Sequence, residues 1–360
     1  MAAGSITAAA LDRRPVALVL STGEAMGDAL TRIAGYRALR IAFPGHRVVH
    51  VCRWSSSLLG PLASLAAELV DQIIDGQSLT RGPRPVRDII RGIGNVEVVI
   101  DLRSNMGAAW SFVATTGTRV RYVANVALYG LRRGFRASFE ARPETNSRRF
   151  HRAVELAAGR LLPFDPFVAV SETAALAADK VVPEGARFVL LAPGTSQSPK
   201  AWPAANWVAL ARHLVTRGAQ PLFVVGPQEL AERNWIEREL PGTAVVDIRS
   251  VRGPAELPWL FHALAARAVG SVTVEGGIGH LVATTGQPLV TISGATDLRR
   301  WRPVTPYHWS ASAHEFGSRR TADVPLEAVV ARAEEMITFA DRTLAATSIL
   351  PAAPVKRIAG

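Results

Sequence analysis

Four short loops contain the residues whose types and spacing could do chemistry. The first spans residues 21–28, after an apolar run and before a helical pattern. Gly23 and Gly27 allow its backbone to turn tightly and to approach a ligand closely. Asp28 lies at the expected start of the helix, where a carboxylate can cap free backbone N–H groups or can face a cleft as a general base. The sequence leaves both roles open for Asp28.

The second loop, residues 192–203, has the composition of a phosphate-binding site. It holds a glycine, the hydroxyl side chains of Thr195 and Ser196, and Lys200, which is one of only three lysines in the chain. Backbone N–H groups and hydroxyls can donate to phosphate oxygens, and a lysine adds positive charge. The pattern is not a Walker loop, because no glycine immediately precedes the lysine. Lys200 is either a phosphate ligand or a solvated loop residue, and the flanking prolines and Trp202 favour the first.

The third loop begins at Glu275 and places three glycines before His280. A helix is expected to begin here, and the backbone amides of Gly276 and Gly277 at its start favour an anion. The Glu275 carboxylate could accept hydrogen bonds from sugar hydroxyls. His280 falls inside the expected helix, where a lone histidine more often has a structural role than a catalytic one.

The fourth loop, residues 293–301, follows the next apolar run and would border the same cleft. The Thr296 hydroxyl could reach a phosphate or a ribose. Asp297 is expected to form a turn or a helix cap, as short carboxylates often do.

Alternating strands and helices must position these loops. Short apolar runs typical of buried parallel strands precede them, at residues 16–20, 188–192, 271–274 and 289–292. A helical pattern covers residues 27–42, whereas residues 83–94 are expected to form a polar connection. Because ligands of parallel α/β sheets bind outside the carboxyl ends of the strands, the four loops are the expected binding loops.

Two such α/β series predict two doubly wound, Rossmann-like domains that face each other across a cleft. Prolines and a glycine near residues 165–185 mark the boundary. We expect an N-terminal domain over residues 15–170, a second domain over residues 171–325 and a helix over residues 326–345. Residues 1–14 and 346–360 are expected to be loose, flexible tails.

Composition excludes several classes of protein. The chain of 360 residues is 48% hydrophobic and carries a net charge of +11, from 41 Lys and Arg against 30 Asp and Glu. That apolar content excludes a mainly disordered chain, and the single Cys52 excludes a disulfide scaffold. No stretch approaches the ~18 apolar residues of a membrane helix, and the N-terminus lacks the charge order of a signal peptide. We therefore expect a cytoplasmic protein.

Several chemistries lack their usual motifs. The sequence contains no GxGxxG fingerprint of a nicotinamide site, no HExxH or paired CxxC of a zinc site, no DxD pair and no GxSxG elbow. We therefore expect no metal and no tightly bound cofactor. Zinc fingers and RNA-recognition motifs are also absent, so no nucleic-acid partner is expected in spite of the basic charge.

Residues 125–150 interrupt the α/β pattern with clustered arginines and interleaved aromatic residues. Such a segment could contact an anionic surface, or it could be a solvated loop. The arginines are Arg132, Arg133, Arg136, Arg142, Arg148 and Arg149.

The four loops, in this order and spacing, resemble the ADP-heptose:lipopolysaccharide heptosyltransferases of glycosyltransferase family 9, which have the GT-B fold. The resemblance runs from about residue 16 to residue 306. It rests on the MGD turn that ends at Asp28, the VIDL segment at 99–102, the PGTS…K.WP segment at 193–203, the glycine loop through His280 and the GATD segment at 294–297.

The resemblance implies an inverting, metal-independent transfer from a nucleotide sugar, ADP-heptose in the leading case, onto lipopolysaccharide core or a related cell-envelope glycan. Asp28 matches the family's proposed base, and Lys200 matches the residue that neutralises the leaving phosphates. Further donor-binding groups implied by the resemblance are Thr195, Ser196, Glu275, Gly276, Gly277 and Thr296. The acceptor would be a glycolipid or oligosaccharide, and the enzyme would touch the cytoplasmic face of the inner membrane.

One departure keeps two alternatives open. The family usually has Asp, then Ser or Thr, then Gly, whereas this chain has Glu275, Gly276 and Gly277. The acid is one methylene longer, and the neighbouring hydroxyl is lost. The alternatives are a family member that uses another donor on another glycan or a protein, and a non-catalytic basic binding module with the same fold.

The basic segment generates the first testable prediction. Replacing Arg132, Arg133 and Arg136 together by Glu reverses three charges in it, so binding to anionic vesicles should fall by at least about tenfold at low salt. Vesicle co-sedimentation measures this. Unchanged vesicle and acceptor binding would show that the segment is only a solvated loop.

Overall fold

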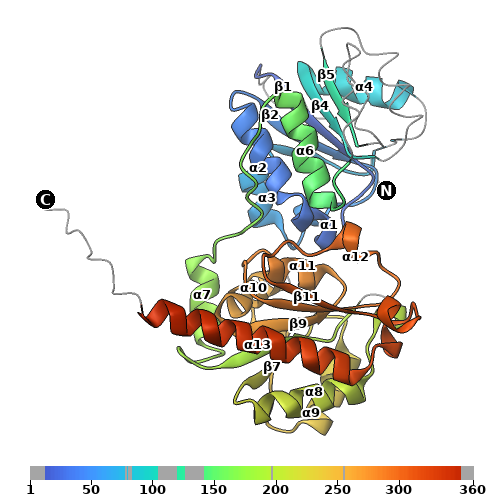
Figure 1. The fold of residues 1–360 in the computed structure, drawn as a ribbon. Helices are drawn as coiled ribbons and strands as arrows, with labels where there is room; N and C mark the ends of the chain where they lie inside the picture. Colours follow the sequence, from blue (N-terminus) through green and yellow to red (C-terminus); the bar gives the residue numbers. More distant parts are fainter. Residues whose placement is uncertain are drawn as a thin grey trace, which may run out of the picture. The chain divides into compact units, whose positions relative to one another are not determined.

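The computed structural model describes residues 13–77, 79, 83–103, 120–125, 142–195, 198–253 and 256–349. The chain divides into two compact units (Figure 1). The N-terminal unit comprises Met1–Ala169, Pro254–Pro258 and Asp297–Val304. The C-terminal unit comprises Val170–Gly253, Trp259–Thr296 and Thr305–Gly360. Each unit is built around one parallel sheet with its own apolar core.

The N-terminal sheet has the strand order β3-β2-β1-β4-β5, and all its pairings are parallel. Its strands are β1 (Val16–Ser21), β2 (Arg47–Cys52), β3 (Gln72–Ile74), β4 (Val96–Asp101) and β5 (Arg121–Ala124). Every residue of β1 is buried, as expected for the central strand of a sheet covered on both faces. Strands β2 and β3 are added on one side of β1, and β4 and β5 are added on the other side. A reversal of strand order of this kind opens a binding crevice at the carboxyl ends of the strands.

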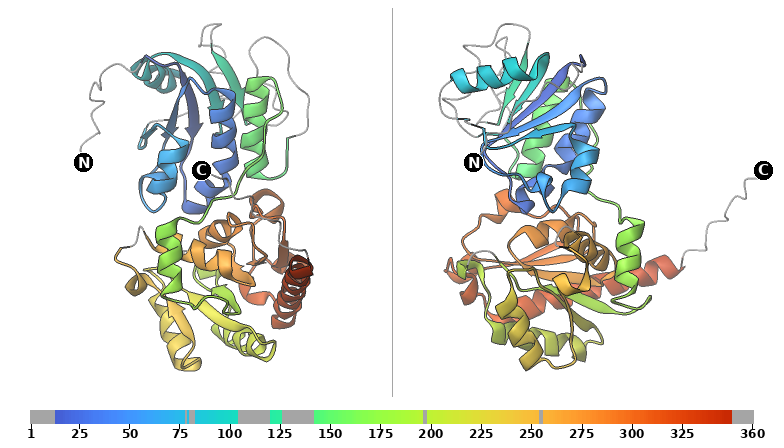
Figure 2. Two further views of the ribbon diagram at one scale, coloured as in Figure 1. Left: turned by 90° about the vertical axis from the view of Figure 1, so that its left-hand side faces the viewer. Right: turned by 180° about the vertical axis from the view of Figure 1, so that it is seen from behind.

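Helices cover both faces of this sheet (Figure 2). They are α1 (Met26–Thr31), α2 (Ile33–Ala42), α3 (Ala63–Leu69), α4 (Pro83–Ile93) and α6 (Asn146–Ala158), with a short 3₁₀ turn, η1 (Ser57–Leu59). Ile89, Ile90 and Ile93 of α4 pack on the face formed by alternate residues of β1, which include Leu18. The sheet face that looks away from α4 is covered by α2 and α6.

Two expectations for this unit were wrong. Residues 83–93 form helix α4 rather than a polar connection, because Ile89, Ile90 and Ile93 pack on the sheet while Asp88 and Arg91 are exposed. The single helix expected over residues 27–42 is divided into two helices at Arg32, whose N–H donates to the Ala29 carbonyl at 3.1 Å. This break separates the helix that carries Asp28 from the longer α2.

The C-terminal sheet has the strand order β11-β10-β9-β6-β7-β8 and is also parallel throughout. Its strands are β6 (Phe188–Ala192), β7 (Gln220–Val224), β8 (Ala244–Val246), β9 (Gly270–Val274), β10 (Leu289–Ser293) and β11 (His308–Ser312). Strand β11 was not predicted, because its residues are polar and half-buried, as in an edge strand.

The helices of this unit are α7 (Glu172–Asp179), α8 (Ala204–Thr216), α9 (Leu230–Glu239), α10 (Leu257–Arg267), α11 (Gly277–Ala283) and α13 (Leu326–Ile349). Short 3₁₀ turns are η3 (Ser198–Lys200), η4 (Ile248–Ser250), η5 (Ala313–Phe316) and η6 (Thr321–Asp323). Helix α13 continues to Ile349, so residues 346–349 are helical and not part of a tail. Helix α12 (Leu298–Trp301) belongs to the N-terminal unit.

No helix in the described part of the chain is long and apolar enough to cross a membrane.

Packing between α2 and α6 generates a stability prediction. Gly35 of α2 faces Phe150 of α6, and a Cβ atom at Gly35 would overlap the phenyl ring. The ring is almost completely buried. Gly35→Ala should therefore lower the free energy of unfolding, because overpacking costs about 1–3 kcal/mol and this overlap lies at the upper end. The gain from replacing a helical glycine, about 1 kcal/mol, is smaller.

Urea unfolding of the purified chain measures this change. Gly45→Ala is the matched control, since a Cβ there meets nothing within 4 Å. Equal stabilities of the two variants would contradict the packing argument.

Candidate active site

Asp28 is the third residue of α1 and lines a cavity of about 320 Å³ in the N-terminal unit. The cavity has a largely polar wall with two aromatic side chains. Its lining residues are Thr22, Gly23, Asp28, Thr31, Arg32, Leu102, Arg103, Asn125, Asn146, Phe150, Arg300 and Trp301. Gly23 has a second, structural reason to be glycine, because a Cβ there would approach the Trp54 side chain to 2.8 Å.

The pKa of the Asp28 carboxyl is raised by burial, and this effect is opposed by a hydrogen bond from the Ala25 backbone N–H and by the charge of Arg300. Ala25 is the N-cap residue of α1 and offers no side-chain cap. The two roles left open by the sequence are therefore compatible, since Asp28 satisfies the helix start and also lines the cavity. Among the described residues, no basic side chain forms an ion pair with Asp28.

The lining of the cavity also contains a buried arginine, Arg103, which is paired with the carboxylate of Asp101. Arg103 donates to Asp101 Oδ1 through Nε at 2.8 Å and to Oδ2 through Nη2 at 2.6 Å. The Tyr122 hydroxyl donates to Asp101 Oδ2 at 2.9 Å. Arg103 Nη1 is buried and has no hydrogen-bond partner among the described residues, and the same is true of Asn125 Oδ1. The site therefore retains unused donor and acceptor capacity for a polar ligand.

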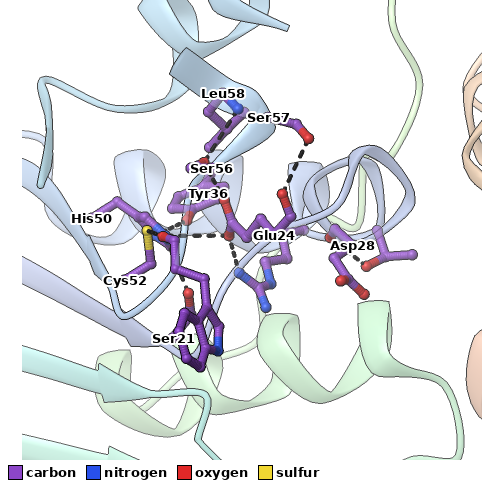
Figure 3. Close-up of polar contacts among 12 residues, drawn as sticks. Ser21, Glu24, Asp28, Tyr36, His50, Cys52, Ser56, Ser57 and Leu58 are labelled. Atoms are coloured by element: carbon purple, nitrogen blue, oxygen red, sulfur yellow. Dashed lines mark hydrogen bonds and ion pairs between the residues drawn. The ribbon is translucent and has the colours of Figure 1, made fainter. Parts of the chain in front are cut away.

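Sequence reasoning missed the network around Glu24, which lies beside Asp28 (Figure 3). The Glu24 carboxylate contacts Arg32, His50 and Ser56, and its side chain is completely buried. One signal could have revealed it: His50 is the one polar residue of the apolar segment 48–52, and a buried polar side chain requires a partner.

In the C-terminal unit, the loops after β6 and β9 bring Lys200 and Glu275 together. Lys200 Nζ lies 3.6 Å from Glu275 Oε1. Glu275 is 5% exposed, and neither of its carboxylate oxygens has a hydrogen-bond partner among the described residues. Because β6 and β9 are adjacent parallel strands, their carboxyl ends place a cation and an acid side by side. Sequence reasoning chose both residues but did not foresee the ion pair.

His280 lies within α11, as predicted, and close to Lys200. Burial and the charge of Lys200 lower the pKa of the His280 imidazole to about 4. The imidazole is therefore neutral near pH 7, which agrees with a structural role rather than with a cation for phosphate.

The remaining predicted donor residues lie on neighbouring strand ends. Gly276 is the N-cap of α11 and Gly277 its first residue, while Thr296 follows β10, the neighbour of β9. Asp297 caps α12 by accepting from the Arg299 N–H at 3.1 Å, as expected. Thr195 follows β6 at the same edge of the sheet. Ser196 lies outside the described residues.

Within the described ranges, no group of three or more His, Cys, Asp or Glu side chains is arranged to hold a metal ion.

Comparisons with known proteins agree with the resemblance seen in the sequence. Lipopolysaccharide heptosyltransferase 3 of Escherichia coli strain K12 is 28% identical over 163 residues, which are 42% of this chain and 46% of that protein. The chain thus matches about half the length of this curated relative.

Two solved structures have a similar fold. A glycosyltransferase of family 9 from Veillonella parvula has a TM-score of 0.65 at 16% identity, over 91% of this chain and 98% of that chain. The ADP-heptose lipopolysaccharide heptosyltransferase II of Escherichia coli has a TM-score of 0.61 at 14% identity, over 91% and 100%. The predicted GT-B fold class, with two parallel α/β units, is confirmed.

The model of one protein family, glycosyltransferase family 9 (heptosyltransferase), matches residues 86–323, more than half of the chain. The match includes the Lys200 and Glu275 loops and the segment that carries Arg300. The chain therefore belongs to glycosyltransferase family 9.

Proposed function

We propose that this glycosyltransferase moves a sugar from a nucleotide sugar onto a cell-envelope glycan, with inversion and without a metal ion. The leading case is heptose from ADP-heptose onto lipopolysaccharide core. The observation that carries the proposal is Asp28, a carboxylate without an ion-pair partner among the described residues, in the wall of a polar cavity. The name of the solved Escherichia coli relative, which includes ADP-heptose, supports the choice of donor.

The acceptor occupies the cavity of the N-terminal unit and presents one hydroxyl to Asp28. The carboxylate takes the hydroxyl proton while the hydroxyl oxygen forms its bond to the anomeric carbon of the donor sugar. The bond between that carbon and the diphosphate oxygen breaks, and the diphosphate leaves with the electron pair. Attack opposite the leaving group inverts the anomeric centre. Arg103 and Asn125 supply hydrogen-bonding groups that orient the acceptor sugar.

The donor binds at the carboxyl edge of the C-terminal sheet. Lys200 neutralises the charge that develops on the leaving diphosphate, and such preorganised charge is most effective where it meets the transition state. Hydroxyls of Thr195, Ser196 and Thr296 and amides of Gly276 and Gly277 add donors. Glu275 accepts hydrogen bonds from donor-sugar hydroxyls with the oxygens that lack partners among the described residues.

A glycolipid acceptor would bring the enzyme to the cytoplasmic face of the inner membrane. The excess of arginines in residues 125–150 supports this placement, because anionic lipid headgroups attract basic segments.

A nucleotide panel tests the donor assignment. Thermal unfolding is followed with ADP, UDP, GDP, CDP and ADP-heptose, since a ligand that binds the native state raises the midpoint by mass action. We expect a shift that is selective for ADP and ADP-heptose and is lost in Lys200→Ala. Lys180→Ala is the matched control, because Lys180 is exposed at the end of α7 and should leave the shift unchanged.

Each outcome of the panel has a distinct meaning. A shift with UDP or GDP alone would retain a transferase but discard heptose. No shift with any nucleotide would favour a non-catalytic binding module.

The pH dependence of turnover tests the base. Asp28 must be ionised to accept a proton, so kcat/KM should rise with pH through the Asp28 pKa. Burial raises that pKa above the ordinary value of 3.8, so activity is lost on acidification sooner than for an exposed aspartate. Arg300→Gln removes a charge that lowers the pKa, so the acidic limb should move to higher pH.

The measurement is a pH–rate profile with ADP-heptose and heptose-deficient lipopolysaccharide core. Asp28→Asn should lower kcat by at least about 10² while leaving ADP affinity unchanged. An acidic limb that Arg300→Gln moves to lower pH would contradict the assignment.

A further inference from the structure

Glu24 is a buried acid whose partners come from three different elements of the N-terminal unit. Ser56, which precedes η1, donates to Oε2 at 2.9 Å. His50 of β2 lies 3.3 Å from Oε1 through Nε2, and Arg32 pairs with Oε1 through Nη1. Figure 3 shows Ser56 and His50 next to Glu24, with Asp28 to one side of them. Burial of a charge with so many partners indicates a fixed structure rather than a solvated side chain.

The backbone around Glu24 is fixed as well. Residues 22–24 run beside the segment that follows β2, with Trp54 N–H donating to Thr22 C=O at 3.0 Å. The Glu24 carbonyl accepts from both the N–H and the hydroxyl of Ser57, each at 3.1 Å. Side chain and main chain of Glu24 thus join the Asp28 loop to the neighbouring loop after β2.

The protonation states give the network a net charge of zero. Burial and the charge of Arg32 hold the His50 pKa well below its ordinary value, so the imidazole is neutral. Burial raises the Tyr36 pKa, so its hydroxyl stays protonated and donates to His50 Nδ1. His50 Nε2–H then lies 3.3 Å from two acceptors, Ser21 Oγ and Glu24 Oε1. Arg32 is therefore the single countercharge within the network of described side chains.

Glu24 and Arg32 lie at opposite ends of helix α1. Glu24 lies two residues before α1, and Arg32 follows its last residue, Thr31. Helix α1 has six residues and no side-chain N-cap. A helix this short has little stability of its own. The ion pair joins its two ends, and Asp28 lies between them.

We propose that Glu24 is a positioning residue that acts through Asp28, by clamping both ends of α1 so that the carboxylate is held toward the cavity. It also holds the Arg32 guanidinium, which lines the same cavity. Only the expected effect of Glu24 on kcat rests on the proposed function. The clamping of α1 is a property of the fold and is measured separately.

Hydrogen exchange and kinetics of the full chain test the clamp. In Glu24→Gln the isosteric amide keeps the shape and loses the charge, so amides of residues 22–32 should exchange at least about tenfold faster. With ADP-heptose and heptose-deficient lipopolysaccharide core, kcat should fall at least about tenfold. The Kd for ADP should stay within about twofold, because the proposed diphosphate ligands lie in the other unit.

A double-mutant cycle separates positioning from general destabilisation. If Glu24 acts through Asp28, adding Glu24→Gln to Asp28→Asn should lower kcat by less than about threefold further. Glu155→Gln is the matched control, since Glu155 is a buried, ion-paired acid of α6 that does not line the cavity. It should leave both the exchange of residues 22–32 and kcat unchanged.

Two results would overturn the inference: unchanged exchange in residues 22–32, or a full tenfold loss in the Asp28→Asn background. Ser56→Ala is the milder variant if Glu24→Gln does not fold, and it should accelerate the same exchange by a smaller factor. A wild-type chain without ADP-heptose turnover would refute the proposed function, whereas the exchange data would still decide whether Glu24 clamps α1.

Discussion

Parallel pairing of the strands is the constraint on which both units depend. Every pairing between the described strands runs in the same direction, so the loops after successive strands emerge at one edge of each sheet. This arrangement brings Lys200, Glu275 and Thr296 to adjacent strand ends, although up to 96 residues separate them in the sequence. It likewise places the Asp28 loop beside Arg103, which follows β4. The parallel direction of the strands therefore determines which polar side chains lie together in each unit.

Three acids that are buried in the described part of the chain each have a basic partner. Asp101 pairs with Arg103, Glu24 with Arg32 and Glu275 with Lys200, whose own side chain is partly exposed. Burying a charge without a partner costs several kcal/mol of folding free energy, and a partner of opposite charge offsets part of that cost. Asp28 has no such partner among the described residues, and the effect of burial on its carboxyl is opposed by a backbone N–H and by the charge of Arg300. The unpaired acid is the group that the proposed reaction requires to take up a proton.

The sequence was most informative where its pattern was local. Apolar runs identified the central strands, and the glycine and hydroxyl loops identified Lys200 and Glu275. Two features depended on contacts that no local pattern contains. Strand β11 pairs at an edge with polar residues, and Glu24 obtains its partners from segments up to 32 residues away. Asp28 was predicted as the base from its motif, whereas the Glu24 network beside it was not predicted.

Phe150 is part of the packing between α2 and α6 and also lines the cavity. Its ring packs against Gly35 and, edge to face at 5.0 Å, against Tyr36, and it also forms part of the cavity wall. The position of that wall is therefore set by the spacing between α2 and α6. Paired substitutions of compensating volume at positions 35 and 150 would change the size of the cavity and leave every polar group in place. Evolution could thus alter which acceptor fits by repacking two helices, without any change in the residues that do the chemistry.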